Sequence, residues 1–437
     1  MLTVRGQPLH LTFRNREPHE PPLTLPPPPP PLSLSLPPCT FSLLHLPLVA
    51  ALKEQPITWH LDALRLPFPR SDMTSTLSYA LGLSKPLIYI VGGCAADQGW
   101  IDFASPPDGT GMFACLTVTD RCDAYDPINN VYVACSSAPR PRYRHAAVEV
   151  DGYLFLLGGV NANDEVVKQV DKYDPVSDSW SVHGVWEDAT TDLAAFVRRN
   201  VDHSATIFAV GGYRPELDYE TTNRVTQIDP LKFSAVYEAN PASRKNLKIG
   251  RGDIMAATSS TYAYVQGGYS SEGDNAWCET LPSVERYDFA TGYWETIPSS
   301  QAAHTSSADG VLVAMSGSIY SIGGETKDNC DQTTTVAVKE VAVLSEMIES
   351  WRDATEIPIE TFRFSAAAVH DTKAIYLFGG QNYYNEECNC FKVSDQVTYM
   401  KDSTWVVESF NSANRNSGGA GVLAAAAAAI LAALMLF

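Results

Sequence analysis

The chain has 437 residues, with 31 Lys and Arg against 50 Asp and Glu, and therefore a formal net charge of −19. Nucleic-acid affinity rests on the neutralisation of phosphates by Lys and Arg, so no nucleic-acid partner is expected for so acidic a chain. Eight of the nine cysteines follow residue 70, which favours disulfides and an oxidising compartment.

Residues 1–70 form a proline-rich leader, which holds 16 of the 29 prolines and the unbroken run Pro26–Pro31. This composition predicts a disordered segment that is separate from the globular part. The best candidate for a signal peptide is the apolar stretch Phe41–Ala51, but forty residues precede it. The leader therefore contains no clean secretory signal.

Six Gly-Gly pairs follow the leader, separated by 66, 53, 56, 56 and 56 residues. Each pair ends a short apolar run rich in β-branched and aromatic residues, which predicts a strand, and a second apolar segment before the run predicts a hairpin. The pairs suit positions where the main chain needs a positive φ or where a neighbouring chain leaves no room for a Cβ. They are Gly92-Gly93, Gly158-Gly159, Gly211-Gly212, Gly267-Gly268, Gly323-Gly324 and Gly379-Gly380.

A third strand is predicted after the pairs, and in three repeats it ends in an aspartate turn that leads to an aromatic residue six positions later. In the third repeat Asp229-Pro230 keeps the turn, but Ala235 stands in the aromatic position. Asp caps local amide groups and Pro presets φ, which explains the turn. In the sixth repeat, Tyr399 and Trp405 stand one residue closer together than in the others, and the fifth repeat keeps only Trp351. The full spacing occurs from Asp126 to Tyr132, from Asp174 to Trp180 and from Asp288 to Trp294.

The succession of hairpin, Gly-Gly pair, loop, Tyr-Asp-Pro turn and Trp resembles the kelch repeat over residues 71–409. The resemblance implies an all-β, six-bladed propeller with four antiparallel strands per blade, in which Tyr and Trp side chains pack between neighbouring blades. Neither end of the chain shows a spare half repeat, so it stays open whether a terminal strand closes the ring.

The positions of the cysteines suggest which of them pair. Cys278 and Cys330 follow the Gly-Gly pairs of adjacent repeats at similar distances, which predicts that their loops share a face and that the two form a bridge. The same reasoning predicts that Cys94 pairs with Cys388 or Cys390, in a disulfide that would link the first blade to the sixth.

Residues 410–437 join a polar stretch of small residues to an apolar segment that begins at Val422. As a helix the apolar segment would span about 24 Å, less than the hydrocarbon core of about 30 Å. The pattern is typical of a glycosylphosphatidylinositol attachment signal, with Asn411 or Ser412 as the attachment site and Ser417 as the next candidate. An Ala-rich helix docked on the domain, or an ordinary tail anchor, is the alternative.

These features favour a non-catalytic binding scaffold, anchored to the membrane at the cell surface. It would recognise a protein or a glycan through the loops that follow the Gly-Gly pairs, because a rigid ring positions its loops for binding. The loop Cys94–Arg121 is the longest, and Trp100, Phe103 and Phe113 are its candidate contact residues. No catalytic residue, cofactor or metal ligand is assigned.

Two other functions compete with this prediction. An extracellular carbohydrate-active enzyme, similar to sugar mutarotases or to galactose oxidase, would need polar side chains that converge on the central channel. Arg144, Arg251 and Arg363 precede first strands at comparable places, but no His and Tyr set for copper can be assembled. An intracellular kelch adaptor would need a BTB or F-box domain, and the leader shows neither. The tripeptide Arg251-Gly252-Asp253 is interpreted as repeat sequence rather than as an adhesion motif.

Overall fold

A computed structural model of the chain describes residues 58–95, 100–104, 114–115, 117–200, 202–273, 276–297, 307–327, 335–346, 349–385, 387 and 390–401. All of them belong to one compact unit, Glu54–Phe437, whereas the unit Met1–Lys53 lies outside the described residues. The predicted Cys278–Cys330 bridge stays a prediction, because Cys330 is not among the described residues.

The described residues form an all-β propeller of six four-stranded antiparallel blades, which confirms the predicted fold. The first two blades contain, from the inner to the outer strand, β3 (Thr74–Ser78), β4 (Leu87–Val91), β8 (Cys122–Asp126) and β9 (Val131–Ala134), then β10 (Ala146–Val150), β11 (Tyr153–Leu157), β12 (Gln169–Asp174) and β13 (Ser179–Val185). The next two contain β14 (Ala194–Arg199), β15 (Ala205–Val210), β18 (Val225–Ile228) and β19 (Ala235–Tyr237), then β20 (Met255–Thr258), β21 (Tyr262–Gln266), β22 (Val284–Asp288) and β23 (Tyr293–Thr296). The last two contain β24 (Val311–Met315), β25 (Ser318–Ile322), β28 (Val341–Ser345) and β29 (Ser350–Asp353), then β30 (Ser365–Val369), β31 (Ala374–Phe378), β34 (Val397–Lys401) and β1 (Thr58–Leu61).

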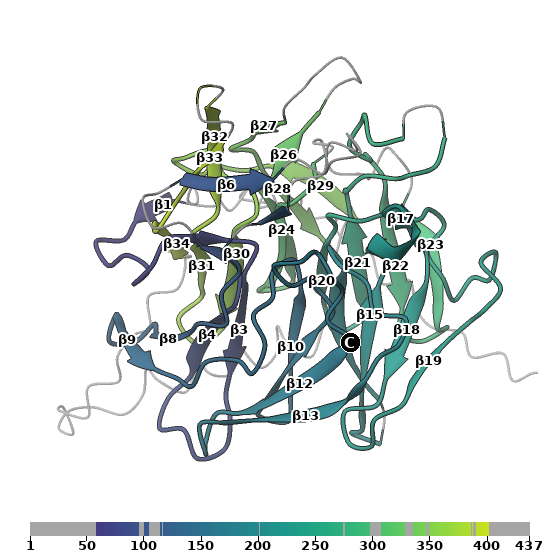
Figure 1. Cartoon of the computed structure of the whole chain (residues 1–437), viewed down its shortest axis with the longest axis horizontal. Helices are drawn as coiled ribbons and strands as arrows, with labels where there is room; N and C mark the ends of the chain where they lie inside the picture. Colours follow the sequence, from purple (N-terminus) through teal and green to yellow (C-terminus); the bar gives the residue numbers. More distant parts are fainter. Residues whose placement is uncertain are drawn as a thin grey trace, which may run out of the picture. The chain divides into compact units, whose positions relative to one another are not determined.

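The first strand of each blade faces the axis. Neighbouring first strands contact one another in the order β3, β10, β14, β20, β24 and β30, and β30 contacts β3, so the ring is closed. In the ribbon drawing the first strands lie toward the middle and the outer strands β9, β13, β19 and β23 lie at the periphery (Figure 1).

The Gly-Gly pairs lie where neighbouring blades approach most closely. A Cβ on the first glycine of the fourth pair, Gly267, would lie 1.9 Å from the carbonyl oxygen of Ser307 in the next blade. The second glycine, Gly268, donates its N–H to that same oxygen over 3.0 Å, and both glycines have a positive φ. Equivalent N–H···O bonds of 2.8 to 3.0 Å join every pair to the following blade, and the sixth pair returns to the first blade through Arg70. Only glycine satisfies both conditions, because any side chain would separate the blades.

The ring closes with a strand from the N-terminal side of the repeats. Strand β1 pairs antiparallel with β34 as the outer strand of the sixth blade, with Trp59 opposite Met400. The prediction that the propeller begins at residue 71 is therefore wrong, because the sixth repeat completes its sheet with residues of the supposed leader. Trp405 lies outside the described residues, and the aromatic position of this blade is filled by Trp59.

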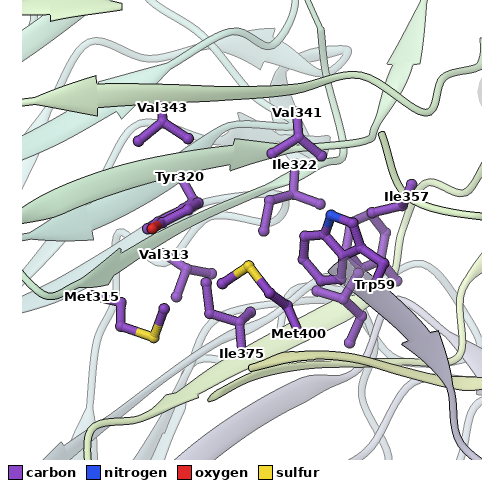
Figure 2. Packing of buried hydrophobic residues seen from close by; sticks show 12 residues of the cluster. Trp59, Val313, Met315, Tyr320, Ile322, Val341, Val343, Ile357, Ile375 and Met400 are labelled. Atoms are coloured by element: carbon purple, nitrogen blue, oxygen red, sulfur yellow. The ribbon is translucent and has the colours of Figure 1, made fainter. Parts of the chain in front are cut away.

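Trp59 joins the sixth blade to the fifth. Its indole is 8% exposed and lies beside Met400 and Ile357 (Figure 2). Its ring N–H donates to the carbonyl oxygen of Thr355, which follows the outer strand of the fifth blade, over 2.9 Å. Strand β1 thus takes part in the same interblade packing that the repeats use elsewhere.

Aromatic side chains fill the other interfaces between blades, as the resemblance implies. Tyr125 of the first blade packs edge-on against Tyr376 of the sixth, with ring centroids 5.3 Å apart. Tyr173 of the second blade packs in the same way against Tyr89 of the first, at 5.4 Å. These large apolar contacts replace water along each interface, and such burial contributes most of the favourable free energy of folding.

Short accessory sheets cover the end of the propeller at which the Gly-Gly pairs lie, here called the loop face. They are β2 (Arg70–Ser71) with β5 (Cys94–Ala95), β16 (Tyr213–Arg214) with β17 (Glu220–Thr221), β26 (Glu325–Thr326) with β27 (Val336–Ala337), and the four strands β32 (Gln381–Asn385), β33 (Cys390–Val393), β6 (Trp100–Ala104) and β7 (Ala114–Cys115). A single 3₁₀ turn, η1 (Pro215–Leu217), joins β16 to β17 in the described part of the chain. Main-chain pairing gives these loops a defined shape.

The disulfides differ from the predicted pairing of Cys94 with the sixth blade. Cys94 is bonded to Cys115 within the long loop of the first blade, and Cys122 to Cys135, with Cα atoms 5.9 and 5.5 Å apart. The prediction is wrong because the long loop folds back on its own blade. The first and sixth blades are linked instead by main-chain pairing between β6 and β33 (Figure 1).

Candidate functional site: six residues around the propeller axis

One residue of each blade lies at the loop-face end of the central channel, two positions before the first strand. All of these residues have a left-handed main chain, with φ between 52° and 55°. This conformation is uncommon for residues other than glycine, although Asp adopts it more readily than most. The six, here called the axial ring, are Asp72, Arg144, Asp192, Asp253, Asp309 and Arg363.

Main-chain hydrogen bonds join the axial ring into a closed circle. The N–H of each member donates to the carbonyl oxygen of the member in the preceding blade, over distances of 2.7 to 3.0 Å. The circle closes where Asp72 donates to Arg363 over 2.8 Å. These bonds satisfy buried amide groups that would otherwise lose their water partners, and this compensates for the strained φ values.

The side chains of the axial ring alternate in charge over only part of the circle. Arg144 lies between two carboxylates, with its Nε 3.5 Å from both Asp72 and Asp192. Arg363 donates from Nε to Asp309 over 2.7 Å and lies 3.7 Å from Asp72. Asp253 has no arginine beside it in the circle, because its neighbours are Asp192 and Asp309.

These three neighbouring aspartates are crowded. One oxygen from each of Asp192, Asp253 and Asp309 lies within 4.8 Å of the others. Asp253 accepts a hydrogen bond from the Tyr213 hydroxyl over 2.7 Å. Carboxylates at this spacing either share protons or surround a cation, because several negative charges do not coexist unscreened in a buried site.

Burial changes the acidity of this cluster. It raises the pKa of Asp253 well above its usual range, and the nearby Asp309 and Asp192 carboxylates raise it further. Burial also raises the pKa of Asp192 to about 6, against the opposing effect of Arg144. Glu325 accepts a hydrogen bond from the Tyr269 hydroxyl and is 2% exposed, and burial raises its pKa to about 7.

The cavity at the axial ring is small. Its volume is about 130 Å³, and its walls include Met73, His145 and Leu193 as well as the ring itself. Burial lowers the pKa of His145 well below its usual value, and its Nε2 lies 3.1 Å from the Thr74 hydroxyl. Pockets for small organic molecules usually measure about 300–1,000 Å³, so this cavity suits a few waters or an ion better than a sugar.

Only two of the three arginines expected to share one face do so. Arg144 and Arg363 belong to the axial ring, but Arg251 lies two positions earlier in its repeat and is fully buried. Its Nη2 lies 3.1 Å from Glu285 of β22, and it also donates to the carbonyl oxygen of Gly267. Arg70 and Arg142 occupy the same place in the first two blades and pair with Asp123 and Asp171. The adhesion-like tripeptide is thus internal repeat sequence, and Asp253 is its contribution to the axial ring.

Four of the six ring positions are aspartates that sequence reasoning missed. The signal was present, because an Asp or Arg stands two residues before every first strand, in a conformation that Asp tolerates. The main chain of Trp100 and Phe103 lies in β6, which pairs with β33 and β7, and Phe113 lies outside the described residues. The attachment candidates Asn411 and Ser412 also lie outside them.

Two larger cavities open on the loop face. One of about 550 Å³ lies between the third and fourth blades and includes Arg214 and Trp277. The other, of about 740 Å³, lies between the fifth and sixth blades and includes Lys339 and Tyr383. Both are in the size range of ligand pockets and are formed by loops and accessory strands rather than by the four strands of each blade.

Comparison with known proteins agrees with this architecture. A family described as the Attractin/LZTR1 beta-propeller matches residues 119–387, more than half of the chain. Kelch-like protein 25 of Xenopus tropicalis is 22% identical over 308 residues, which are 67% of this chain and 42% of that protein. Alpha-scruin of Limulus polyphemus is 24% identical over 259 residues, or 59% and 25% of the two chains. Kelch-like protein 36 of Bos taurus is 24% identical over 238 residues, or 54% and 35%. The matched regions span less than half the length of each of these relatives.

Proposed function

Because the chain belongs to the Attractin/LZTR1 β-propeller family, we propose that it is a non-catalytic scaffold that binds a protein partner through its loop face. The observation that carries this proposal is the pairing of described loop segments on the loop face. Four accessory sheets include segments of the loops that follow the first, third, fifth and sixth Gly-Gly pairs. A rigid ring that holds structured loops at one end can present a large recognition surface without ordering it on binding.

The axial ring supports a structural role better than a catalytic one. Both of its arginines already pair with ring carboxylates, and the cavity beside them measures only about 130 Å³. A sugar-converting enzyme would need room for a ring and an acid–base pair aimed at it. The buried polar circle instead joins all six blades near the axis.

The proposal includes an extracellular or secretory location. Cys94–Cys115 and Cys122–Cys135 are internal disulfides, and such bonds persist in oxidising compartments. Within the described residues there is no helix long and apolar enough to cross a bilayer. Anchoring through a lipid attached at Asn411 or Ser412 remains part of the proposal and rests on the sequence of residues 410–437 alone.

Treatment of cells with a phosphatidylinositol-specific phospholipase tests the anchor. We expect the enzyme to release the protein into the medium, and a change of both Asn411 and Ser412 to bulky residues to abolish its surface display. A protein that stays on the membrane after treatment would exclude this anchor. That result would not affect the proposal that the propeller binds a protein partner.

Binding through the loop face is tested by presenting the secreted propeller to an array of extracellular protein domains. Three exposed loop-face residues are each changed to alanine, alongside exposed residues of the same type on turns at the other end of the blades. The loop-face set is Leu217, Val336 and Tyr383, and the control set is Leu231, Val176 and Tyr153. We expect the loop-face changes to lower the affinity for the partner that the array identifies. The control changes should leave this affinity within about twofold of the parent value. Equal losses in both sets would contradict the proposal.

A further inference from the structure

The cavity between the third and fourth blades has walls that are tied together. One wall is the β16–β17 hairpin, and the other is the loop that follows β21. Thr221 donates its N–H to the Ser271 hydroxyl over 2.9 Å, and Ser271 donates its own N–H to the Thr221 hydroxyl over 3.1 Å. The cavity of about 550 Å³ therefore exists before any partner binds, which lowers the entropic cost of binding.

The charges that line this cavity are unbalanced. Arg214 lies 2.9 Å from Glu220, and Arg224 lies 3.0 Å from Asp188, so both cations already have partners. Three more acidic residues line the cavity, Asp218, Glu238 and Glu272. Within the described part of the chain, none of the three forms an ion pair with a Lys or Arg. A cationic ligand would balance this charge, and the net charge of −19 would attract it from a distance.

An aromatic ring lies in the same cavity. Trp277 is half-buried, and its indole packs on Tyr213 with ring centroids 5.1 Å apart. Its main-chain N–H donates to the carbonyl oxygen of Ser270 over 3.0 Å. Indole is the best aromatic partner for a cation, and a planar guanidinium can stack on it while it donates paired hydrogen bonds to carboxylates.

We propose that this cavity receives an arginine side chain of a protein partner, stacked at Trp277 and paired with the carboxylates of Asp218, Glu238 and Glu272. The inference rests on the proposed protein-binding function, and it names the chemistry that the loop face recognises. Lysine fits less well, because its ammonium group cannot stack as a plane or bind carboxylates in a fork.

The test uses the disulfide-bonded propeller and a Gly-Ser-Arg-Gly-Ser peptide, with the citrulline peptide as a neutral match of almost the same shape. Titration calorimetry is expected to show at least fivefold weaker binding of the citrulline peptide, and weaker binding of the arginine peptide as salt rises. Equal affinities for the two peptides would overturn the proposal. So would a neutral oligosaccharide that occupies the cavity in preference to the arginine peptide.

Variants of the protein locate the site. The double change Asp218→Asn and Glu272→Gln is expected to lower the affinity for the arginine peptide at least fivefold. The control Glu165→Gln and Glu187→Gln removes the same charge from exposed positions of the second blade and is expected to stay within twofold of the parent. Trp277→Gly removes the ring and also relieves a φ of +64°, so loss of binding with an unchanged melting temperature would be specific to the ring.

The outcome separates this inference from the proposed function. If the cavity variants keep full affinity for the partner found on the loop face, the arginine pocket is wrong and the binding scaffold stands. If no extracellular partner is sensitive to any loop-face change, the scaffold proposal fails and the pocket falls with it.

Discussion

Replacing Gly267 by alanine tests whether the closeness of the blades, rather than the main-chain conformation alone, requires glycine. Gly267 has a φ of +70°, and a Cβ there would lie 1.9 Å from the carbonyl oxygen of Ser307. Gly317, in the turn between β24 and β25, has a φ of +75° and no atom within 4 Å of its would-be Cβ. Both substitutions place an alanine at a positive φ, but only the one at position 267 also brings a Cβ into contact with the next blade.

The shared cost of a left-handed alanine is about 1–2 kcal/mol. At position 267 the new methyl group must also displace main chain of the next blade by more than 1 Å, since ordinary contacts begin near 3.4 Å. That movement breaks the 3.0 Å hydrogen bond from Gly268 to Ser307, worth about 1 kcal/mol, and strains a packed interface by about 1–3 kcal/mol. Gly267→Ala should therefore cost about 2–4 kcal/mol more than Gly317→Ala.

Guanidinium chloride unfolding under non-reducing conditions, followed by circular dichroism, measures this difference. Both variants should keep the β spectrum of the parent, and Gly267→Ala should unfold at a clearly lower denaturant concentration. If the two variants lost the same stability to within about 0.5 kcal/mol, interblade contact would not be the reason for these glycines, and the reasoning would be refuted.

Other predictions concern buried groups. Burial raises the pKa of Glu325 to about 7. Between about pH 4.5 and about pH 7 the folded state therefore holds a proton that the unfolded state has released. The stability that this protonated side chain contributes is lost as the pH rises through that range. Glu325→Gln should accordingly reduce the drop in melting temperature between pH 5 and pH 7.5, and an unchanged drop would contradict this. Arg251→Met should lower the free energy of unfolding by about 3–5 kcal/mol, because it leaves the Glu285 carboxylate buried without its partner. Adding Glu285→Leu should restore part of this loss. A double variant that loses as much stability as the sum of the two single changes would oppose this account. Trp59→Ala should lower the free energy of unfolding by about 3–5 kcal/mol in the same assay. Leu61 lies in the same strand and is 49% exposed, so Leu61→Ala should cost far less. Similar losses for the two variants would argue against β1 as the closing strand.

Local pattern was enough to predict the blades. The Gly-Gly pairs and the turns after Asp126, Asp174 and Asp288 depend on main-chain conformation and on strand pairing within one repeat, and both are properties of short segments. The same short range explains why the count of six blades and their antiparallel strands could be read without coordinates.

Contacts between distant segments decided the rest. Nothing near Trp59 marks it as the partner of Met400, because a lone four-residue strand has no repeat around it and gains its stability only from the sheet that it completes. The disulfide of Cys94 depended on the path of a long loop, for which several pairings were possible from spacing alone. The axial ring needed both kinds of information. Its aspartates recur in the sequence, but they meet at the axis only when the circle closes, and the burial and charge crowding that raise the pKa of Asp253 follow from that closure.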